Sequence, residues 1–136
     1  MAYPNCQAND GPYGSFMADP QGAGIGIYIR CKFAEPGGQT PDKRPILQIC
    51  GVAEREDVIT LQPIAAGAVG TVKFANAGGE QYGQMAGACS CADALYTQAL
   101  GKVGTATGSG ALLLGKATIA GSDGGPVTFT KNTPIA

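Results

Sequence analysis

IGIYIRCKF, residues 25–33, is the stretch that decides the fold class of this chain. Apolar side chains alternate through it with glycine or more polar residues: Ile25, Ile27, Ile29, Cys31 and Phe33 against Gly26, Tyr28, Arg30 and Lys32. Successive side chains of a strand point to opposite faces, so this period of two predicts a strand over residues 25–33 with one buried face.

Further short apolar stretches follow the first at intervals of roughly ten to fifteen residues, separated by glycine, proline or charged turns. They cover residues 46–53, 58–62, 69–75, 94–97, 102–107, 111–120 and 127–131, and the stretch 111–120 is the most apolar. One weak helical turn is possible over residues 90–95. This spacing predicts an all-β fold, a small β-barrel or sandwich, with residues 25–136 as a single β-domain.

The composition agrees with an all-β chain that has a packed core. Glycine and proline are abundant (22 and 9 of 136 residues), which disfavours helices and suits tight turns. Hydrophobic residues make up 44% of the chain and charged residues only 14%, which argues against disorder. A domain of this size needs neither a metal nor a disulfide to fold.

Residues 1–24 differ from the rest of the chain and predict an irregular N-terminal arm. The segment is too rich in proline and glycine for a regular element, yet it carries Tyr3, Tyr13, Phe16 and Met17. Tyr3, Tyr13 and Phe16 are aromatic and supply large contact area at low entropy cost; together with Met17 they are candidates for contacts with a partner. The alternative is an arm that folds back and covers an edge strand of its own domain.

The sequence lacks the residues of the common catalytic sites. It has no histidine, which removes the usual general base near neutral pH. Glu54 and Glu56 flank Arg55 and are expected to form a solvated turn. The segment Gly110–Ala117 nearly matches a phosphate-binding loop, but Ala117 has no hydroxyl for magnesium and three leucines favour a buried strand. We therefore expect no enzymatic activity and no cofactor.

Five cysteines are present, at positions 6, 31, 50, 89 and 91, and we expect reduced thiols without a metal. Cys89 and Cys91 could be half of a zinc site completed by Cys31 or Cys50, but their spacing is unusual for zinc. The net charge of −1 offers no basic surface for nucleic acid. No secretory signal and no apolar stretch of membrane-spanning length is found.

Several short motifs resemble the capsid cement (head decoration) proteins of tailed bacteriophages. The resemblance covers roughly residues 50–131 and rests on a DALY strand, a GKV motif that follows it after a turn, and four glycine-containing pieces; the matching segments are 93–96, 101–103, 113–117, 124–129, 51–53 and 70–73. The first 24 residues have no counterpart in this pattern. Ser90-Cys91-Ala92 also replaces the glycine-rich turn that the family places before DALY.

The resemblance implies a β-barrel or sandwich that binds the outer surface of an icosahedral head and stabilises the expanded capsid lattice. It further implies a homotrimer, the major capsid protein as partner, assembly in the host bacterial cytoplasm and a final location on the virion. Alternatives are another virion component, such as a head-fibre base, tail-tube subunit or adhesin, or a small ligand-binding β-barrel.

Overall fold

The computed structural model describes residues 12–35 and 44–131, and within them the chain is all-β, as predicted. The strands are β1 (Tyr13–Ala18), β2 (Arg30–Ala34), β3 (Ile46–Ile49), β4 (Val58–Thr60), β5 (Val69–Phe74), β6 (Glu80–Gln84), β7 (Ala94–Thr97), β8 (Val103–Gly104), β9 (Leu113–Ala117) and β10 (Pro126–Lys131). A short 3₁₀ turn, η2 (Ala99–Gly101), separates β7 from β8.

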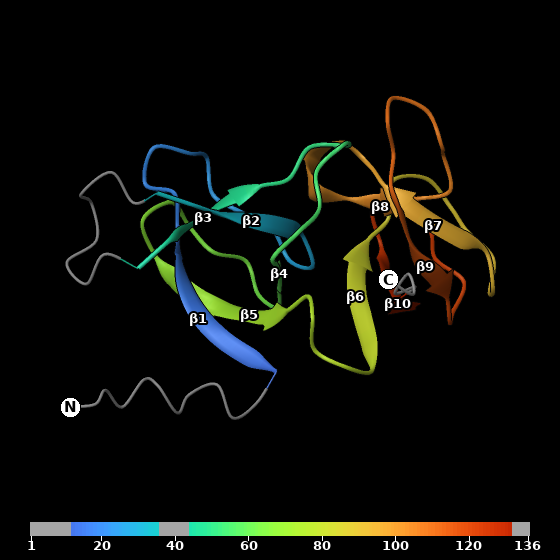
Figure 1. Ribbon diagram of the computed structural model, residues 1–136, viewed down its shortest axis with the longest axis horizontal. Coiled ribbons are helices and arrows are strands. Elements are labelled where there is room, and N and C mark those ends of the chain that lie inside the picture. Colours follow the sequence, from blue (N-terminus) through green and yellow to red (C-terminus); the bar gives the residue numbers. More distant parts are fainter. Residues whose placement is uncertain (1–11, 36–43, 132–136) are drawn as a thin grey trace.

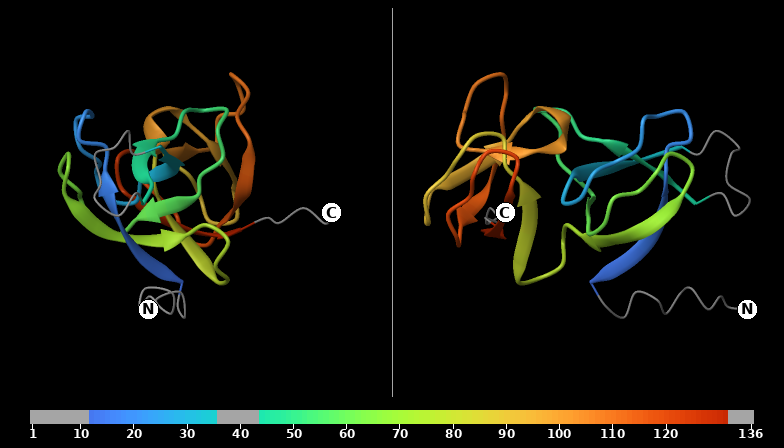
Figure 2. Two further views of the ribbon diagram at one scale, coloured as in Figure 1. Left: turned by 60° about the vertical axis from the view of Figure 1, so that its left-hand side comes forward. Right: turned by 180° about the vertical axis from the view of Figure 1, so that it is seen from behind.

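The strands form two lobes that lie side by side (Figure 1). Lobe 1, residues 12–35 and 44–75, is a closed barrel with strand order β1-β3-β2-β4-β5. Lobe 2, residues 76–131, is a five-stranded sheet with order β6-β10-β9-β7-β8. A parallel bridge between Met85 and Val103 brings the two edges of this second sheet together. Figure 2 shows the two lobes from two further directions.

The two lobes are repeats of one another. In lobe 1 antiparallel pairing runs β1 with β5, β5 with β4, β4 with β2 and β2 with β3, and a short parallel contact joins β3 to β1. Lobe 2 has the same series: β6 with β10, β10 with β9, β9 with β7, β7 with β8, and the parallel Met85–Val103 bridge. Each strand of lobe 1 therefore has a topological equivalent in lobe 2.

The register of the repeat holds residue by residue. Val58 pairs with Phe74 in lobe 1, and the equivalent Gly115 pairs with Lys131 in lobe 2. The turns before β5 and β10 agree as well, because Gly67 and Gly124 have nearly equal positive φ (77° and 78°). Their N–H groups donate to the equivalent carbonyls of Ala18 (3.1 Å) and Met85 (2.9 Å).

Each lobe has its own hydrophobic core. Lobe 1 buries nine residues in one cluster: Phe16, Ala18, Ile25, Ile29, Cys31, Leu47, Val58, Ile64 and Val72. The second cluster lies within lobe 2 but also includes Ile59 of β4: Ile59, Met85, Cys89, Leu95, Val103, Leu114, Ala117, Val127 and Phe129. Because Ile59 belongs to lobe 1 and packs in the second core, the two lobes are joined by apolar contacts.

Several predicted strand limits are wrong. The strand predicted over residues 25–33 is β2, Arg30–Ala34, and Ile25 forms an isolated bridge with Ile64 instead. The segment 111–120 forms a strand only over Leu113–Ala117, and residues 90–95 form a turn followed by β7.

The predicted irregular arm over residues 1–24 is also corrected where the structure describes it. Residues 13–18 form β1, which closes the barrel by pairing with β5 along Tyr13–Met17. Gly14 is required there, because a Cβ at this position would lie 2.9 Å from the Phe74 ring. The glycine that suggested an irregular segment is therefore a packing requirement of a strand.

Among residues 12–35 and 44–131, no helix is long and apolar enough to cross a membrane.

Candidate functional site

A buried arginine joins the two lobes. Arg30, at the start of β2, is fully buried, although the alternation of residues 25–33 placed it opposite the apolar face. Its guanidinium donates to four main-chain carbonyls, two from each lobe: Glu54 (2.9 Å), Gly51 (3.2 Å), Gln98 (2.8 Å) and Lys102 (3.1 Å). A planar five-donor group can satisfy several carbonyls at once, which explains why arginine occupies this position.

The carboxylate of Glu56 balances this buried charge. Its Oε1 lies 3.7 Å from Arg30 Nη1, and its side chain is only 5% exposed. Burial lowers the pKa of Arg30, and the nearby Glu56 carboxylate opposes that shift. The sequence predicted a solvated turn for both Glu54 and Glu56. Glu54 is half-exposed and pairs with Lys32, but for Glu56 the prediction is wrong.

Lobe 1 also covers one end of lobe 2. Thr97 donates from Oγ1 to the carbonyl of Val52, and Lys131 donates from Nζ to the carbonyl of Ala75. In the repeat, Thr97 is equivalent to Phe33 and Lys131 to Phe74, by the registers of β2 and β5. At the equivalent end of lobe 1, aromatic side chains therefore occupy the place that the other lobe takes at this end of lobe 2.

Phe16 is the centre of that aromatic end, which corrects its prediction as a partner-binding residue. It is 7% exposed and lies 4.9 Å from Phe33 and 6.0 Å from Phe74, measured between ring centroids. The guanidinium of Arg44 lies over its ring at 4.5 Å. Phe16 is consequently a core residue and has little surface left for a partner.

The other predicted partner residues of β1 lie on the outer face of the barrel. Tyr13 is 49% exposed, and Met17 is half-buried beside Val69, which is 60% exposed. Ile46 of β3 pairs with Met17 on its other side but is only 4% exposed, so the exposed apolar surface is that of Tyr13, Met17 and Val69. Tyr3, the fourth predicted partner residue, lies outside the described residues.

The equivalent face of lobe 2 is more polar. Tyr13 corresponds to Glu80, Met17 to Gln84 and Val69 to Pro126, because β1–β5 and β6–β10 share one register. Since lobe 2 has the same topology without these apolar residues, the fold does not require them on the outer face. We call Tyr13, Met17 and Val69 the outer apolar row.

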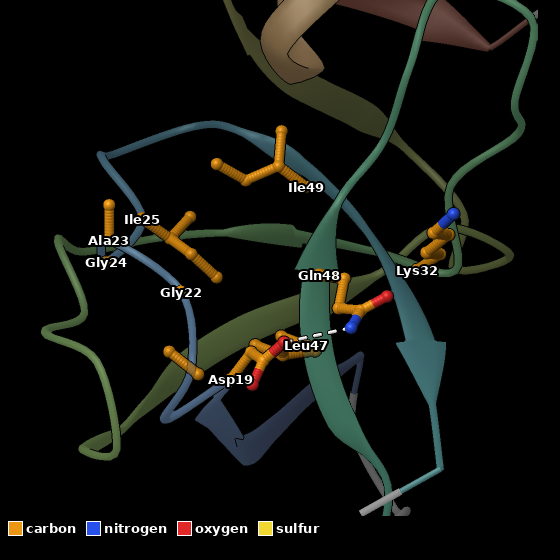
Figure 3. A pocket seen from close by; sticks show the side chains of 10 residues that line it. Asp19, Gly22, Ala23, Gly24, Ile25, Lys32, Leu47, Gln48 and Ile49 are labelled. Carbon is orange, nitrogen blue, oxygen red and sulfur yellow. Dashed lines mark hydrogen bonds between the residues drawn. The ribbon is translucent and has the colours of Figure 1, made fainter.

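A groove also lies on lobe 1 (Figure 3), lined in part by Ala18, the residue that follows Met17 in the chain. It has a volume of about 340 Å³ and lies between the loop after β1 and the outer side of β3. Its lining residues are Ala18, Asp19, Gly22, Ala23, Gly24, Ile25, Lys32, Leu47, Gln48 and Ile49. Asp19 Oδ2 accepts a hydrogen bond from Gln48 Nε2 (2.9 Å) across the floor of the groove.

The cysteines of the described residues do not gather into a metal site. Cys31, Cys50 and Cys89 are buried free thiols, and Cys91 is exposed. Burial raises the pKa of Cys31 to about 12 and that of Cys50 to about 11, so both thiols stay protonated near neutral pH. Within residues 12–35 and 44–131, no three His, Cys, Asp or Glu side chains are placed to hold a metal ion.

The near match to a phosphate-binding loop is a strand, as predicted, but it is not buried on both faces, because Leu114 is buried and Leu113 is exposed. Leu113–Ala117 is β9, whose Gly115 and Lys116 pair with Lys131 and Thr130 of β10. A phosphate-binding loop requires open main-chain N–H groups ahead of a helix, and no helix follows β9 in the described chain.

Two surfaces of lobe 1 thus stand out from the repeat: the outer apolar row and the groove between the loop after β1 and β3. Sequence analysis identified Tyr13 and Met17 of the row but missed Val69 and the whole groove, which depend on pairing between distant strands. Comparison of the chain with protein-family models and with curated protein sequences finds no match.

Proposed function

We propose that the protein is a structural component of a bacteriophage particle that binds the outer surface of the head and stabilises the expanded capsid lattice. The observation that carries this proposal is the outer apolar row. Tyr13 and Val69 are exposed on lobe 1 and Met17 is half-buried, and their equivalents on lobe 2 are Glu80, Gln84 and Pro126. Apolar residues that a fold does not need are typical of a contact surface.

The chemistry of the chain supports a binding role without catalysis. It has no histidine, and the two strongly buried thiols have raised pKa values that make them poor nucleophiles. Arg30 holds the lobes in a fixed arrangement through carbonyls of both. A rigid body that contacts several shell subunits gains affinity because later contacts become intramolecular.

We further propose that the protein acts as a homotrimer whose partner is the major capsid protein, with no role for nucleic acid or membrane. Binding only the expanded lattice would stabilise that lattice by linkage. The motifs that resemble cement proteins, among them Asp93–Tyr96 and Gly101–Val103, support this choice over a tail or fibre component.

The repeat supplies a matched test of this proposal. Met17→Lys places a charge in the outer apolar row, and Gln84→Lys places the same charge at the equivalent position of lobe 2. We expect Met17→Lys to lower occupancy on expanded shells by about tenfold, roughly 1.4 kcal/mol, and Gln84→Lys to leave it unchanged. Occupancy is measured by co-sedimentation of purified protein with expanded and unexpanded shells.

Equal binding of both variants would refute the assignment of this face. Binding of the parent to neither kind of shell would refute the proposed function. Gold labelling of intact particles separates the alternatives, because a tail or fibre component would be labelled away from the head. Light scattering of the purified protein tests the trimer.

A further inference from the structure

The groove of lobe 1 is an addition to the fold. Six residues, 19–24, connect Ala18 to Ile25, whereas three residues, 86–88, connect the equivalent Met85 and Cys89 of lobe 2. Asp19 and Gln48 line the groove, and their equivalents are Ala86 and Gly104. A Cβ on Gly104 would lie 2.6 Å from the Ala86 carbonyl oxygen, so in lobe 2 the loop packs directly on the strand. The groove therefore exists because lobe 1 has a longer loop and a larger side chain at position 48.

On the side of the groove, the main chain of β3 has no partner at Ile49 among residues 12–35 and 44–131. Cys50 N–H donates to Arg30 O (3.0 Å), whereas Leu47 O accepts from Asp19 N–H (3.0 Å). Main-chain groups of alternate residues point to opposite sides of a strand, so the N–H and C=O of Ile49 point away from β2. The register of β1 with β3 ends at Ala18 and Leu47, and β1 therefore offers Ile49 no main-chain partner.

The side chains around this open edge disfavour an acidic occupant. The Asp19 carboxylate accepts from Gln21 N–H and Gln48 Nε2 (both 2.9 Å), which are neutral amides, so no cation among the described residues balances its charge. The Lys32 ammonium, by contrast, is paired with Glu54. The 37%-exposed Ile49 provides apolar surface in the groove, whereas Ile25, which also lines it, is only 7% exposed.

We propose that this groove binds an extended polypeptide segment of a partner protein that carries no acidic side chain, and that the segment adds as a strand beside β3 where β1 departs. The main chain of the segment pairs with the N–H and C=O of Ile49, and one apolar side chain packs against the side chain of Ile49. Strand addition takes affinity from main-chain hydrogen bonds and specificity from such side-chain contacts. The site is distinct from the outer apolar row, and its occupancy does not depend on head binding.

The probe is a blocked, uncharged pentapeptide of alternating valine and threonine, titrated into ¹⁵N-labelled full-length protein. We expect saturable shifts of the main-chain amides of Ile49 and Gly24. An otherwise identical peptide that is N-methylated at its central residue cannot donate the same hydrogen bond and should bind at least about tenfold more weakly. Equal binding of the two peptides, or no saturable shift with the parent peptide, overturns the proposal.

Variants of the protein locate the site. Deletion of residues 21–23 together with Gln48→Gly copies the closed arrangement of lobe 2 and should weaken peptide binding by about tenfold. Ile49→Lys, a single change at a partly exposed position, should have the same effect if the deletion variant does not fold. Val69→Lys, in the outer apolar row, should leave peptide binding unchanged. If Val69→Lys abolishes it while Ile49→Lys does not, the peptide binds the outer row and the groove assignment is wrong.

Discussion

Replacing Arg30 by methionine tests whether the lobes depend on the buried guanidinium. The change keeps an unbranched apolar stem but removes the donors that serve four carbonyls, those of Glu54, Gly51, Gln98 and Lys102. It also leaves the Glu56 carboxylate without its cation, 3.7 Å away. Removing one partner of a buried pair costs about 3–5 kcal/mol, so we expect a loss of this size in the free energy of unfolding.

Arg55→Met is the matched control. Arg55 also bridges the lobes, with Nη1 donating to the Leu113 carbonyl at 3.2 Å, but this hydrogen bond is exposed. Its loss should cost less than about 1 kcal/mol. Urea unfolding monitored by circular dichroism and tyrosine fluorescence measures both variants. The fluorescence also reports on the joint, because Tyr28 of lobe 1 stacks on Tyr82 of lobe 2 at 5.2 Å between centroids.

A loss below about 1 kcal/mol for Arg30→Met would refute the reasoning, since the carbonyls would then be satisfied by water at no cost. A second variant separates the two contributions. Adding Glu56→Gln to Arg30→Met removes the unbalanced charge and should restore part of the stability, while the four carbonyls stay without donors. No recovery in the double variant would assign the whole effect to the carbonyls.

Three further predictions concern strand β9 and the thiols. Leu114 is 2% exposed, whereas Leu113 is 36% exposed. Leu114→Ala should therefore lower the free energy of unfolding by about 2–5 kcal/mol, and Leu113→Ala should lower it by clearly less. Equal losses would contradict the described orientation of β9. Cys91 should react with a thiol reagent in the native protein while Cys31 and Cys50 react only after unfolding, as mass spectrometry of labelled peptides would show. Burial raises the pKa of these two thiols from 9.0 to about 12 for Cys31 and about 11 for Cys50. Their contribution to stability is therefore complete below pH 9 and declines as the pH rises toward 11–12. The prediction is contradicted if the urea midpoint does not fall more steeply in this pH range than it does in a variant with both thiols replaced by alanine.

The sequence predicts the fold class well because the short alternating stretches depend only on local side-chain pattern. It fails where a distant partner decides the outcome. Arg30 lies opposite the apolar positions of its stretch, yet it is buried because carbonyls from the turn after β3 and from the β7–β8 connection converge on it. Leu113 and Leu114 are indistinguishable by composition, and only the pairing of β9 sets which one faces the core.

The repeat is invisible in the sequence for a related reason. Across Val58–Phe74 and its equivalent Gly115–Lys131, the identical pairs are Gly67 with Gly124 and Thr71 with Thr128. The shared register is a property of main-chain hydrogen bonds, which many side chains permit. Tyr13 and Met17 of the outer apolar row could be predicted from their residue type. The groove could not be predicted, because it depends on the difference in loop length between two repeats that the sequence does not reveal.

The way lobe 1 covers the end of lobe 2 has a consequence for synthesis on the ribosome. All strands of lobe 1 lie within residues 12–75, so this lobe can close and seal its own end with Phe16, Phe33 and Phe74 before the second half emerges. Lobe 2 then meets the carbonyls of Val52 and Ala75 already in place. Domains generally form in the order of translation. We therefore expect lobe 2 to form against lobe 1, whereas in a permuted chain that begins at residue 76 lobe 2 would have to form before the carbonyls of Val52 and Ala75 are present.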